Sequence, residues 1–274
     1  MNYIPKYLLN EIRSKVDLVR DPSVSEIVFK RSIIESCRLF CQRHERRAIE
    51  KNAQVHSYKM EHPELNVPFS VPTDKRAIKK GIHQIQEAYE WGKRNFNPDN
   101  FNDEFIKGLA YRIAPHLYTG RDTANYRNHG VTVAGASVTP PYPEKLKLEI
   151  PLFVEKMREQ LKCTEIANRI EVAIYAHLHL ARIHPFSDGN GRTARALQDT
   201  IFSYYNLPLP VIEAGERETY YRTLDKAVYG WKHEKNSGDL KHGATEGEAS
   251  FYAFMAGKLN VSLDKLLDCL GYKI

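Results

Sequence analysis

Cysteine, methionine and tryptophan are scarce in this chain of 274 residues, which contains four, four and two of them respectively. The cysteines are too few for a disulfide-stabilised scaffold, and their spacing does not form the paired pattern of a zinc site. The sequence therefore argues against a disulfide-rich domain and against a structural zinc centre.

Long apolar runs are also missing. No stretch approaches the roughly 20 apolar residues of a membrane helix, and the segment Met1–Pro5 lacks a basic region followed by an apolar one. We therefore expect a cytoplasmic protein without a membrane partner. The net charge of +6 is spread along the sequence without a long basic run, so nucleic acid is not an expected partner either.

The sequence does contain enough apolar residues for a full core, because 42% of the residues are hydrophobic and 27% charged. In most segments the apolar residues recur every three or four positions, which predicts a mainly α protein. We expect one domain with an N-terminal helical region (1–75), a core (76–256) and a C-terminal helix (257–274). Helices are expected over Ser23 to about Ala53, around Ile78–Tyr89, from Asn102 to Pro115, from Pro143 to Leu161, over 166–183, after Gly191, over 217–224 and from Ser262, with an irregular connection at Gln54–Asp74.

Residues 126–141 contain the one convincing strand pair, with β-branched residues, two glycines and a terminal proline pair. A hairpin this short is marginally stable by itself, so it must lie over another part of the protein or offer an edge for docking. From these residues alone, a structural flap and a functional flap are equally consistent.

The segment His184–Arg195 places a proton acceptor, a carboxylate, two glycines and two arginines within twelve residues. A new helix should begin after its Gly-Asn-Gly turn, with Arg192 and Arg195 in the first turn. The helix dipole is positive there and disfavours cations, unless an anion binds among them. The pattern therefore predicts a site for a di- or triphosphate, with Asp188 beside it to hold a divalent cation.

Each of these features alone is ordinary, whereas the whole segment resembles the signature of the Fic family. The resemblance covers about Ile78 to Met255, and every defined position of the signature is present: His184, Phe186, Asp188, Gly189, Asn190, Gly191, Arg192 and Arg195. It implies a Fic-type helical bundle with a small β-hairpin flap over the active site.

The resemblance also implies a role for each motif residue. His184 would deprotonate a hydroxyl of a target protein, and Phe186 would anchor the loop in the core. Asp188 would hold Mg²⁺, and Arg195 would reach the γ-phosphate of ATP. The other phosphates would be bound by Gly189, Asn190, Gly191 and Arg192. In-line attack on phosphorus needs this combination of positioning, charge neutralisation and a base.

Most Fic proteins transfer AMP from ATP to a target protein, so the resemblance implies a protein AMP transferase that modifies Ser, Thr or Tyr hydroxyls, including its own. The target would dock by β-augmentation along the flap edge formed by Val131, Thr132, Val133, Ala134, Gly135, Ala136 and Ser137. Removal of AMP is a second hypothesis, and a nucleotide-sensing binding module is a third. The intact His184 argues against a binding module, because binding requires no base. The sequence leaves open the target, the nucleobase and a homo-oligomeric state.

Two further features depend on the resemblance. Many Fic proteins inhibit themselves with a helix of the pattern Ser/Thr-x-x-x-Glu-Gly/Asn, whose Glu pairs with the second motif arginine. The sequence suggests Glu35 and Glu50 as regulatory candidates, although the residues around both depart from the pattern. Tyr220 and Tyr221 are candidates for the adenine side of the site, and two core aromatic residues are the alternative interpretation.

Overall fold

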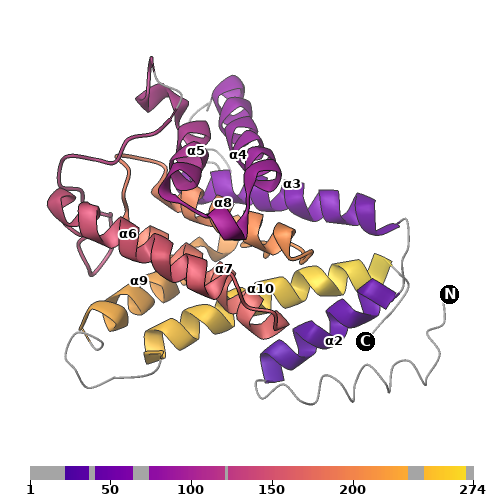
Figure 1. The fold of residues 1–274 in the computed structure, drawn as a ribbon. Helices are drawn as coiled ribbons and strands as arrows, with labels where there is room; N and C mark the ends of the chain where they lie inside the picture. Colours follow the sequence, from indigo (N-terminus) through magenta and orange to yellow (C-terminus); the bar gives the residue numbers. More distant parts are fainter. Residues whose placement is uncertain (1–21, 37–40, 64–73, 121–122, 234–243, 270–274) are drawn as a thin grey trace.

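The structure is a computed structural model that describes residues 22–36, 41–63, 74–120, 123–233 and 244–269 (Figure 1). Within these ranges it is mainly α, as predicted. The helices are α2 (Pro22–Ser36), α3 (Cys41–Glu61), α4 (Lys75–Asn95), α5 (Asp103–Ile113), α6 (Pro143–Gln160), α7 (Ile166–Ile183), α8 (Asn190–Tyr204), α9 (Arg217–His233) and α10 (Glu246–Cys269). Short 3₁₀ turns lie at Pro98–Asn100, Pro115–Leu117 and Ala214–Glu216.

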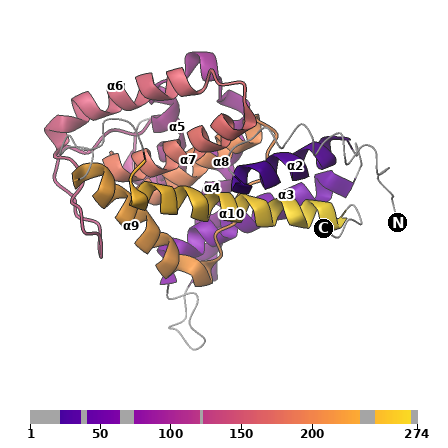
Figure 2. The same ribbon diagram turned by 90° about the horizontal axis from the view of Figure 1, so that it is seen from below.

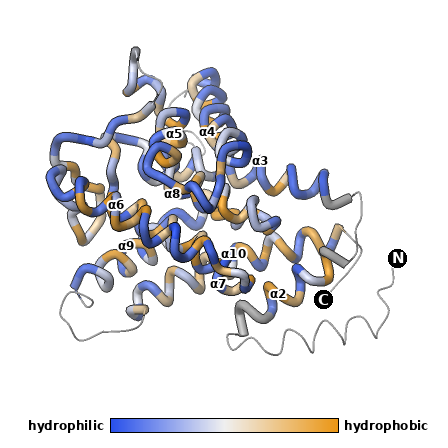
Figure 3. The backbone as a smooth tube through the Cα atoms, in the orientation of Figure 1, coloured by the Kyte–Doolittle hydropathy of each residue, from blue (hydrophilic) through white to orange (hydrophobic). Residues whose placement is uncertain are grey.

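Helices α7 and α8 form the centre of the bundle. They pack against each other, while α4 and α5 cover α8, and α6 and α10 cover α7. Figure 2 shows α6 and α10 on opposite sides of this pair. In Figure 3 the N-terminal half of α3 is largely hydrophilic, whereas apolar residues recur along α6 and α10. The segment between α7 and α8, which carries the motif, is therefore held by the most enclosed part of the molecule.

Several predicted helix boundaries are confirmed by the atoms that form them. The side chain of Asn102 caps α5 by accepting a hydrogen bond from the Phe105 amide at 3.0 Å. Pro143 occupies the start of α6, where its missing N–H costs nothing, and α5 ends just before Pro115. Local signals of this kind do not depend on tertiary packing.

Two helices are longer than predicted. Helix α3 continues to Glu61 through a region that we expected to be irregular, because the first proline of that region, Pro63, comes only after Glu61. Helix α10 begins at Glu246, so Ser262 does not cap a helix. The Ser262 hydroxyl is buried and donates to the Leu209 carbonyl at 2.7 Å. The expected boundary between residues 256 and 257 thus lies inside a helix.

The terminal regions pack on each other through α2 and α10. The ammonium group of Lys30, which is 3% exposed, lies 2.7 Å from a carboxylate oxygen of Glu26 and 2.5 Å from one of Asp264. A buried lysine paired twice in this way is satisfied electrostatically. No helix in the described ranges is long and apolar enough to cross a membrane.

The predicted β-hairpin is not present, because the described residues between α5 and α6 contain no strand. Residues 133–136 instead form a tight turn, in which the Ala136 amide donates to the Val133 carbonyl at 3.1 Å and Gly135 has a φ of 76°. The Ser137 amide and hydroxyl both donate to Asp225 on α9. These contacts hold the segment as a loop, and a strand pair without a neighbouring strand is marginal.

Candidate active site

The turn between α7 and α8 places the candidate base in an uncommon backbone conformation. Helix α7 ends at Ile183, and His184 adopts the left-handed region with φ 51° and ψ 55°. Its amide still donates to the Leu180 carbonyl at 3.0 Å, and Pro185 then prevents the helix from continuing. Such strain in a residue other than glycine is concentrated at functional sites.

The ring of His184 is oriented by one hydrogen bond. Its Nδ1 lies 3.3 Å from the Ala181 carbonyl oxygen, which can only accept, so Nδ1 carries the proton and Nε2 is the basic nitrogen. Burial lowers the pKa of His184, and the positive charge of Arg127 lowers it further. The Ala181 carbonyl and the carboxylates of Glu61 and Asp188 act in the opposite direction without reversing the shift. His184 is therefore neutral near pH 7 and able to accept a proton.

Phe186 and Asn190 hold the loop from inside. The side chain of Phe186, the expected loop anchor, is fully buried, and its ring lies 5.6 Å from that of Tyr126. Asn190 closes the loop with two 2.8 Å hydrogen bonds, since its side chain accepts from the Phe186 amide and donates to the Phe186 carbonyl. Asn190 thus has its backbone amide, rather than its side chain, available to an anion.

The first turn of α8 requires glycine at two positions. Gly189 is the N-cap with a φ of 76°, and a Cβ there would lie 2.9 Å from Ile113 Cγ2. A Cβ at Gly191 would lie only 2.8 Å from Glu61 Oε1. A carboxylate of α3 therefore lies against the start of α8, where backbone amides have no helical partner and attract anions.

Arg195 is 4% exposed, and all three of its guanidinium nitrogens have partners. Two of them bind α3: Nε donates to Ser57 Oγ at 2.8 Å, while NH2 donates to the Ser57 carbonyl at 3.1 Å and to Glu61 Oε1 at 2.6 Å. The remaining nitrogen, NH1, donates to the hydroxyl of Tyr220 at 3.3 Å. Ser57 and Glu61, at the end of α3, thus bind the arginine that the resemblance assigns to the γ-phosphate.

Glu61 is held as an anion at this position. Burial alone would raise its pKa, but attraction to Arg195, a hydrogen bond from Arg195, the charge of Arg192 and a hydrogen bond from Tyr221 together lower it. The two motif arginines at the start of α8 require an anion between them, and Glu61 of the same chain supplies it.

Sequence reasoning missed Glu61, although Ser57-Tyr58-Lys59-Met60-Glu61-His62 matches the self-inhibitory pattern except at its last position, His62. This pattern lies within Gln54–Asp74, for which the sequence predicts an irregular connection and not a helix. Glu50, one of the two candidates, instead accepts hydrogen bonds from Tyr89 at 3.0 Å and Lys93 at 3.3 Å. The side chain of Glu35, the other candidate, lies outside the described part of the structure.

Asp188 lies at the open edge of the loop. Its side chain is 60% exposed, and its Oδ2 is 3.2 Å from NH2 of Arg192, whose buried Nε has no hydrogen-bond partner. No group of three or more His, Cys, Asp or Glu side chains that could hold a metal occurs among the described residues. One exposed carboxylate suits Mg²⁺, which is commonly bound by one or two carboxylates together with phosphate oxygens and water. The residues present therefore fit a metal that arrives with a nucleotide.

Behind Arg195 lies a buried polar chain. His177 is fully buried, with Nδ1 2.9 Å from Gln198 Oε1 and Nε2 2.8 Å from the Tyr220 hydroxyl. Because the Gln198 oxygen can only accept, His177 is protonated on Nδ1 and receives the Tyr220 proton on Nε2. The Tyr220 oxygen is then free to accept from Arg195. Tyr220 is therefore enclosed in this chain, while the partly exposed Tyr221 binds Glu61.

This buried chain predicts an acid-sensitive stability. Burial lowers the pKa of His177 to about 3, whereas an unfolded histidine binds a proton below about 6.5. The unfolded state thus binds more protons below pH 6.5. As the pH drops below this value, His177 should lower the free energy of unfolding by up to about 1.4 kcal/mol for each pH unit. When urea unfolding is measured at pH 7.0 and pH 5.5, the free energy of unfolding should decrease less for His177→Gln than for the wild type. A variant of the exposed His83, His83→Gln, should keep the full loss, and equal losses in all three proteins would refute the assignment.

Arg127 connects the loop after α5 to the motif. Its side chain, which is 4% exposed, donates to the carbonyls of His184 at 2.7 Å, His129 at 2.9 Å and Pro141 at 2.5 Å. Its backbone amide donates to the Pro185 carbonyl at 2.9 Å. Both ends of the loop that contains Val131–Ser137 are thereby tied to the backbone of the candidate base.

Comparison with known proteins agrees with this geometry. Residues 100–202 match the Fic/DOC family. Over 231 residues the chain is 29% identical to protein adenylyltransferase Fic of Nematostella vectensis, covering 82% of this chain and 52% of that protein. Over 134 residues it is 32% identical to protein adenylyltransferase fic-1 of Caenorhabditis elegans, covering 47% of this chain and 24% of that protein. The chain thus spans about half of the first relative and about a quarter of the second.

The fold also has solved counterparts. A Fic domain-containing signalling protein from Bacteroides thetaiotaomicron superimposes with a TM-score of 0.62 at 16% sequence identity, over 97% of this chain and 98% of that chain. At this identity the likeness concerns the fold. It covers nearly the whole of both chains.

Proposed function

We propose that the chain, whose residues 100–202 match the Fic/DOC family, is a protein adenylyltransferase, which transfers AMP from ATP to a Ser, Thr or Tyr hydroxyl of a target protein and of itself. The observation that carries this proposal is the neutral His184, oriented by Ala181 and set beside a helix start with free amides and two arginines. A module that only bound nucleotide would not need this base.

In the proposed reaction the target hydroxyl oxygen attacks the α-phosphorus of ATP. The new P–O bond forms as the bond to the bridging oxygen of the β-phosphate breaks, and pyrophosphate leaves. Nε2 of His184 takes the hydroxyl proton. The backbone amides at Gly189, Asn190 and Gly191, with Arg192, would bind the phosphates and stabilise the negative charge on them. A magnesium ion held by Asp188 and phosphate oxygens would supply further charge neutralisation.

The loop Val131–Ser137 is the proposed docking edge for the target. No strand of the described residues pairs with it, and apart from the amides of Ala136 and Ser137, which donate to Val133 and Asp225, its backbone groups could pair with an extended segment by β-augmentation. Its attachment to Asp225 and, through Arg127, to His184 supports this role, because both fix the edge relative to the base. Of the two adenine-side candidates, Tyr221 is better placed than the enclosed Tyr220 to meet a nucleobase.

We further propose that Glu61 inhibits the enzyme. Its carboxylate binds Arg195 and lies against Gly191, so it would compete with the γ-phosphate for the same positive groups. A nucleotide could still bind through its α- and β-phosphates. Its γ-phosphate would not reach Arg195, so the nucleotide would not take the pose that depends on this contact. Autoinhibition in this chain would thus come from the end of α3.

Arg195 should distinguish triphosphate from diphosphate once Glu61 is removed. In a Glu61→Gly background, Arg195→Ala should weaken ATP binding by about 1.5–3 kcal/mol, the value for a charged hydrogen bond, and ADP binding by much less. Calorimetry with both nucleotides tests this. Equal losses for ATP and ADP would assign Arg195 a structural role only.

Removal of AMP from a modified protein is a second candidate function, favoured by the same Glu61 contact. A carboxylate near the phosphate site could position water for attack on the phosphorus of the AMP ester, so that the P–O bond to the target oxygen breaks and AMP and the free hydroxyl of the target are released. Glu61→Gly should then abolish AMP removal while increasing AMP transfer. Release of AMP from a pre-modified protein, measured for the wild type and the variant, separates the two activities.

The proposed function is tested directly by the mass that the enzyme adds. The purified chain, as wild type and as Glu61→Gly, is incubated with Mg²⁺ and each of ATP, GTP, CTP and UTP, and its intact mass is then measured. An added AMP names both the reaction and the base. No added mass with any nucleotide, on the chain or on proteins of a cell lysate, would contradict the proposal. A cytoplasmic location stays a prediction from the sequence.

A further inference from the structure

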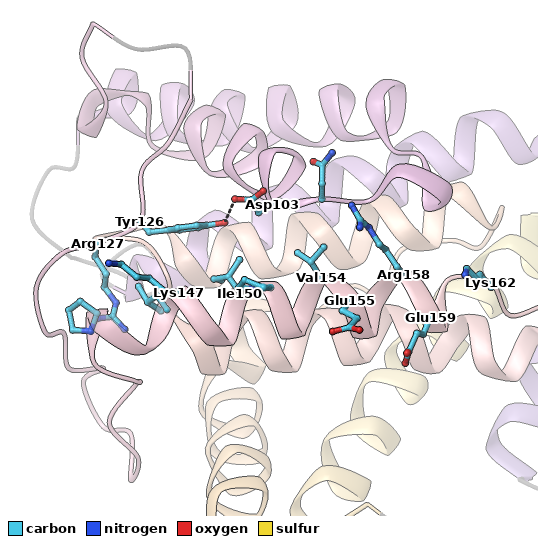
Figure 4. Close-up of a pocket in the computed structure, with 14 residues that line it drawn as sticks. Asp103, Tyr126, Arg127, Lys147, Ile150, Val154, Glu155, Arg158, Glu159 and Lys162 are labelled. Carbon is cyan, nitrogen blue, oxygen red and sulfur yellow. Dashed lines mark hydrogen bonds between the residues drawn. The ribbon is translucent and has the colours of Figure 1, made fainter.

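A groove of about 930 Å³ lies outside the active site, between α6 and the start of α5 (Figure 4). Its lining combines apolar side chains of α6 with polar and charged side chains from both walls. The residues are Asn102, Asp103, Tyr126, Arg127, Pro143, Leu146, Lys147, Ile150, Pro151, Val154, Glu155, Arg158, Glu159 and Lys162. Neither the motif nor the proposed transfer reaction uses this space.

The floor of the groove is apolar and has an open backbone acceptor. Leu146, Ile150 and Val154 lie one helical turn apart on α6 and are 2–8% exposed, so only their edges, with the exposed ring of Pro151, form apolar surface in the groove. Pro151 lies inside α6 and lacks an N–H, so the carbonyl of Lys147, four residues earlier, has no helical donor. The groove thus offers apolar contacts to a peptide segment, beside a helix carbonyl that lacks its usual donor.

The charges along the groove do not cancel. The lining carries four cationic side chains, Arg127, Lys147, Arg158 and Lys162, against the three carboxylates of Asp103, Glu155 and Glu159. Two lysines outside the lining contact these carboxylates: Lys107 lies 2.9 Å from Asp103 and 2.8 Å from Glu104, and Lys156 lies 3.2 Å from Glu159. Nε of Arg158 donates to the Phe101 carbonyl at 2.6 Å, and the guanidinium keeps its positive charge. With Lys147 and Lys162 it gives the lining of the groove an excess of positive charge. An acidic ligand is therefore favoured over a basic one.

One end of the groove is continuous with the proposed docking loop. Arg127 and Pro143 line that end, and Arg127 binds the carbonyls of His129 and Pro141 at the two ends of the loop. Tyr126, also in the lining, packs against the Phe186 anchor. A chain that leaves the groove at Arg127 would therefore meet the loop that lies beside His184.

We propose that this groove is a second docking site of the enzyme, and that it binds an extended segment of the target protein that carries apolar and acidic side chains. The proposal rests on the proposed transferase function. From Lys147 to Arg158 the helix runs for about 17 Å at 1.5 Å per residue, which matches about five extended residues. Binding there would raise the local concentration of the acceptor hydroxyl at His184 without new contacts in the active site.

Binding is tested first, independently of catalysis. The probe is a fluorescein-labelled ten-residue peptide of leucine, aspartate and glycine, and its counterpart has lysine in place of aspartate. Fluorescence anisotropy with the full chain should show binding of the acidic peptide only. Lys147→Glu/Lys162→Glu should weaken it at least tenfold. The matched control Lys79→Glu/Lys145→Glu carries the same charge change outside the groove and should bind as the wild type does.

The second test measures transfer. The acidic peptide is joined through a flexible linker to an acceptor segment containing threonine, and AMP transfer to it by the Glu61→Gly enzyme is followed. The groove segment should lower KM at least tenfold relative to the acceptor alone, with kcat unchanged, and Lys147→Glu/Lys162→Glu should remove this gain.

Equal loss of binding in both double variants, or binding of the lysine peptide, would overturn the groove proposal. So would a KM that the groove segment does not change. In that case continued self-modification by the Glu61→Gly enzyme would leave the transferase function standing. Peptide binding without any transfer would contradict the transferase function instead.

Discussion

His184→Ala should abolish AMP transfer while leaving nucleotide affinity nearly intact. The imidazole acts on a proton that moves only in the transition state, so its loss costs little ground-state binding. General-base catalysis contributes roughly 10²–10⁴-fold, and the transfer rate should fall by at least this amount. Labelling of target and enzyme with radioactive ATP, combined with calorimetry of ATP binding, measures both quantities in the Glu61→Gly background.

The control is His83→Ala, which removes an exposed histidine of α4 and should label at the parent rate. A His184→Ala protein that still labels at that rate would refute the base assignment.

The pH dependence of the transfer rate tests the same assignment in a second way. Because burial lowers the pKa of His184 below the usual 6.5, the acidic limb of the rate profile should lie below pH 6.5. The rate then falls as pH falls through that pKa, because protonated His184 cannot accept the hydroxyl proton.

Glu61→Gly should raise self-modification and target modification by roughly 10- to 100-fold. The variant frees Arg195 from a 2.6 Å charged contact, and a charged hydrogen bond is worth about 1.5–3 kcal/mol, or roughly one to two powers of ten. ATP could then bind Arg195 and the N-terminal amides of α8 without competition from the Glu61 carboxylate. Intact mass of the purified protein over time, at fixed ATP and Mg²⁺, gives the rate.

The matched control is Glu50→Gly, on the same helix, whose carboxylate binds Tyr89 and Lys93 rather than Arg195. It should leave the transfer rate unchanged. Glu61→Gly also leaves a buried guanidinium without its carboxylate, so ATP should raise the melting temperature of this variant more than that of the wild type. Equal rates for Glu61→Gly and the wild type would mean that the contact does not inhibit.

Much of the fold and the centre of the site could be predicted from the sequence. The Asn102 cap, the prolines at the ends of α5 and α6, and the Gly-Asn-Gly turn act through the backbone within a few residues of themselves. The motif residues lie within twelve positions, so their proximity follows from one turn between two helices. The burial of Phe186 agrees with the role of loop anchor that the resemblance implies for it.

Tertiary structure decided which groups meet across long distances in the chain. Ser57 and Glu61 reach Arg195 over 138 and 134 positions, and no local signal encodes that approach. The same holds for Asp225, which turns the expected hairpin into a tethered loop, and for Arg127, which ties that loop to His184. The sequence by itself determined that an anion must lie among the motif arginines, since like charges at a helix start are unfavourable. Only packing of α3 against α8 decided that this anion is Glu61, because helical periodicity fixes which residues share a face but not which helices become neighbours.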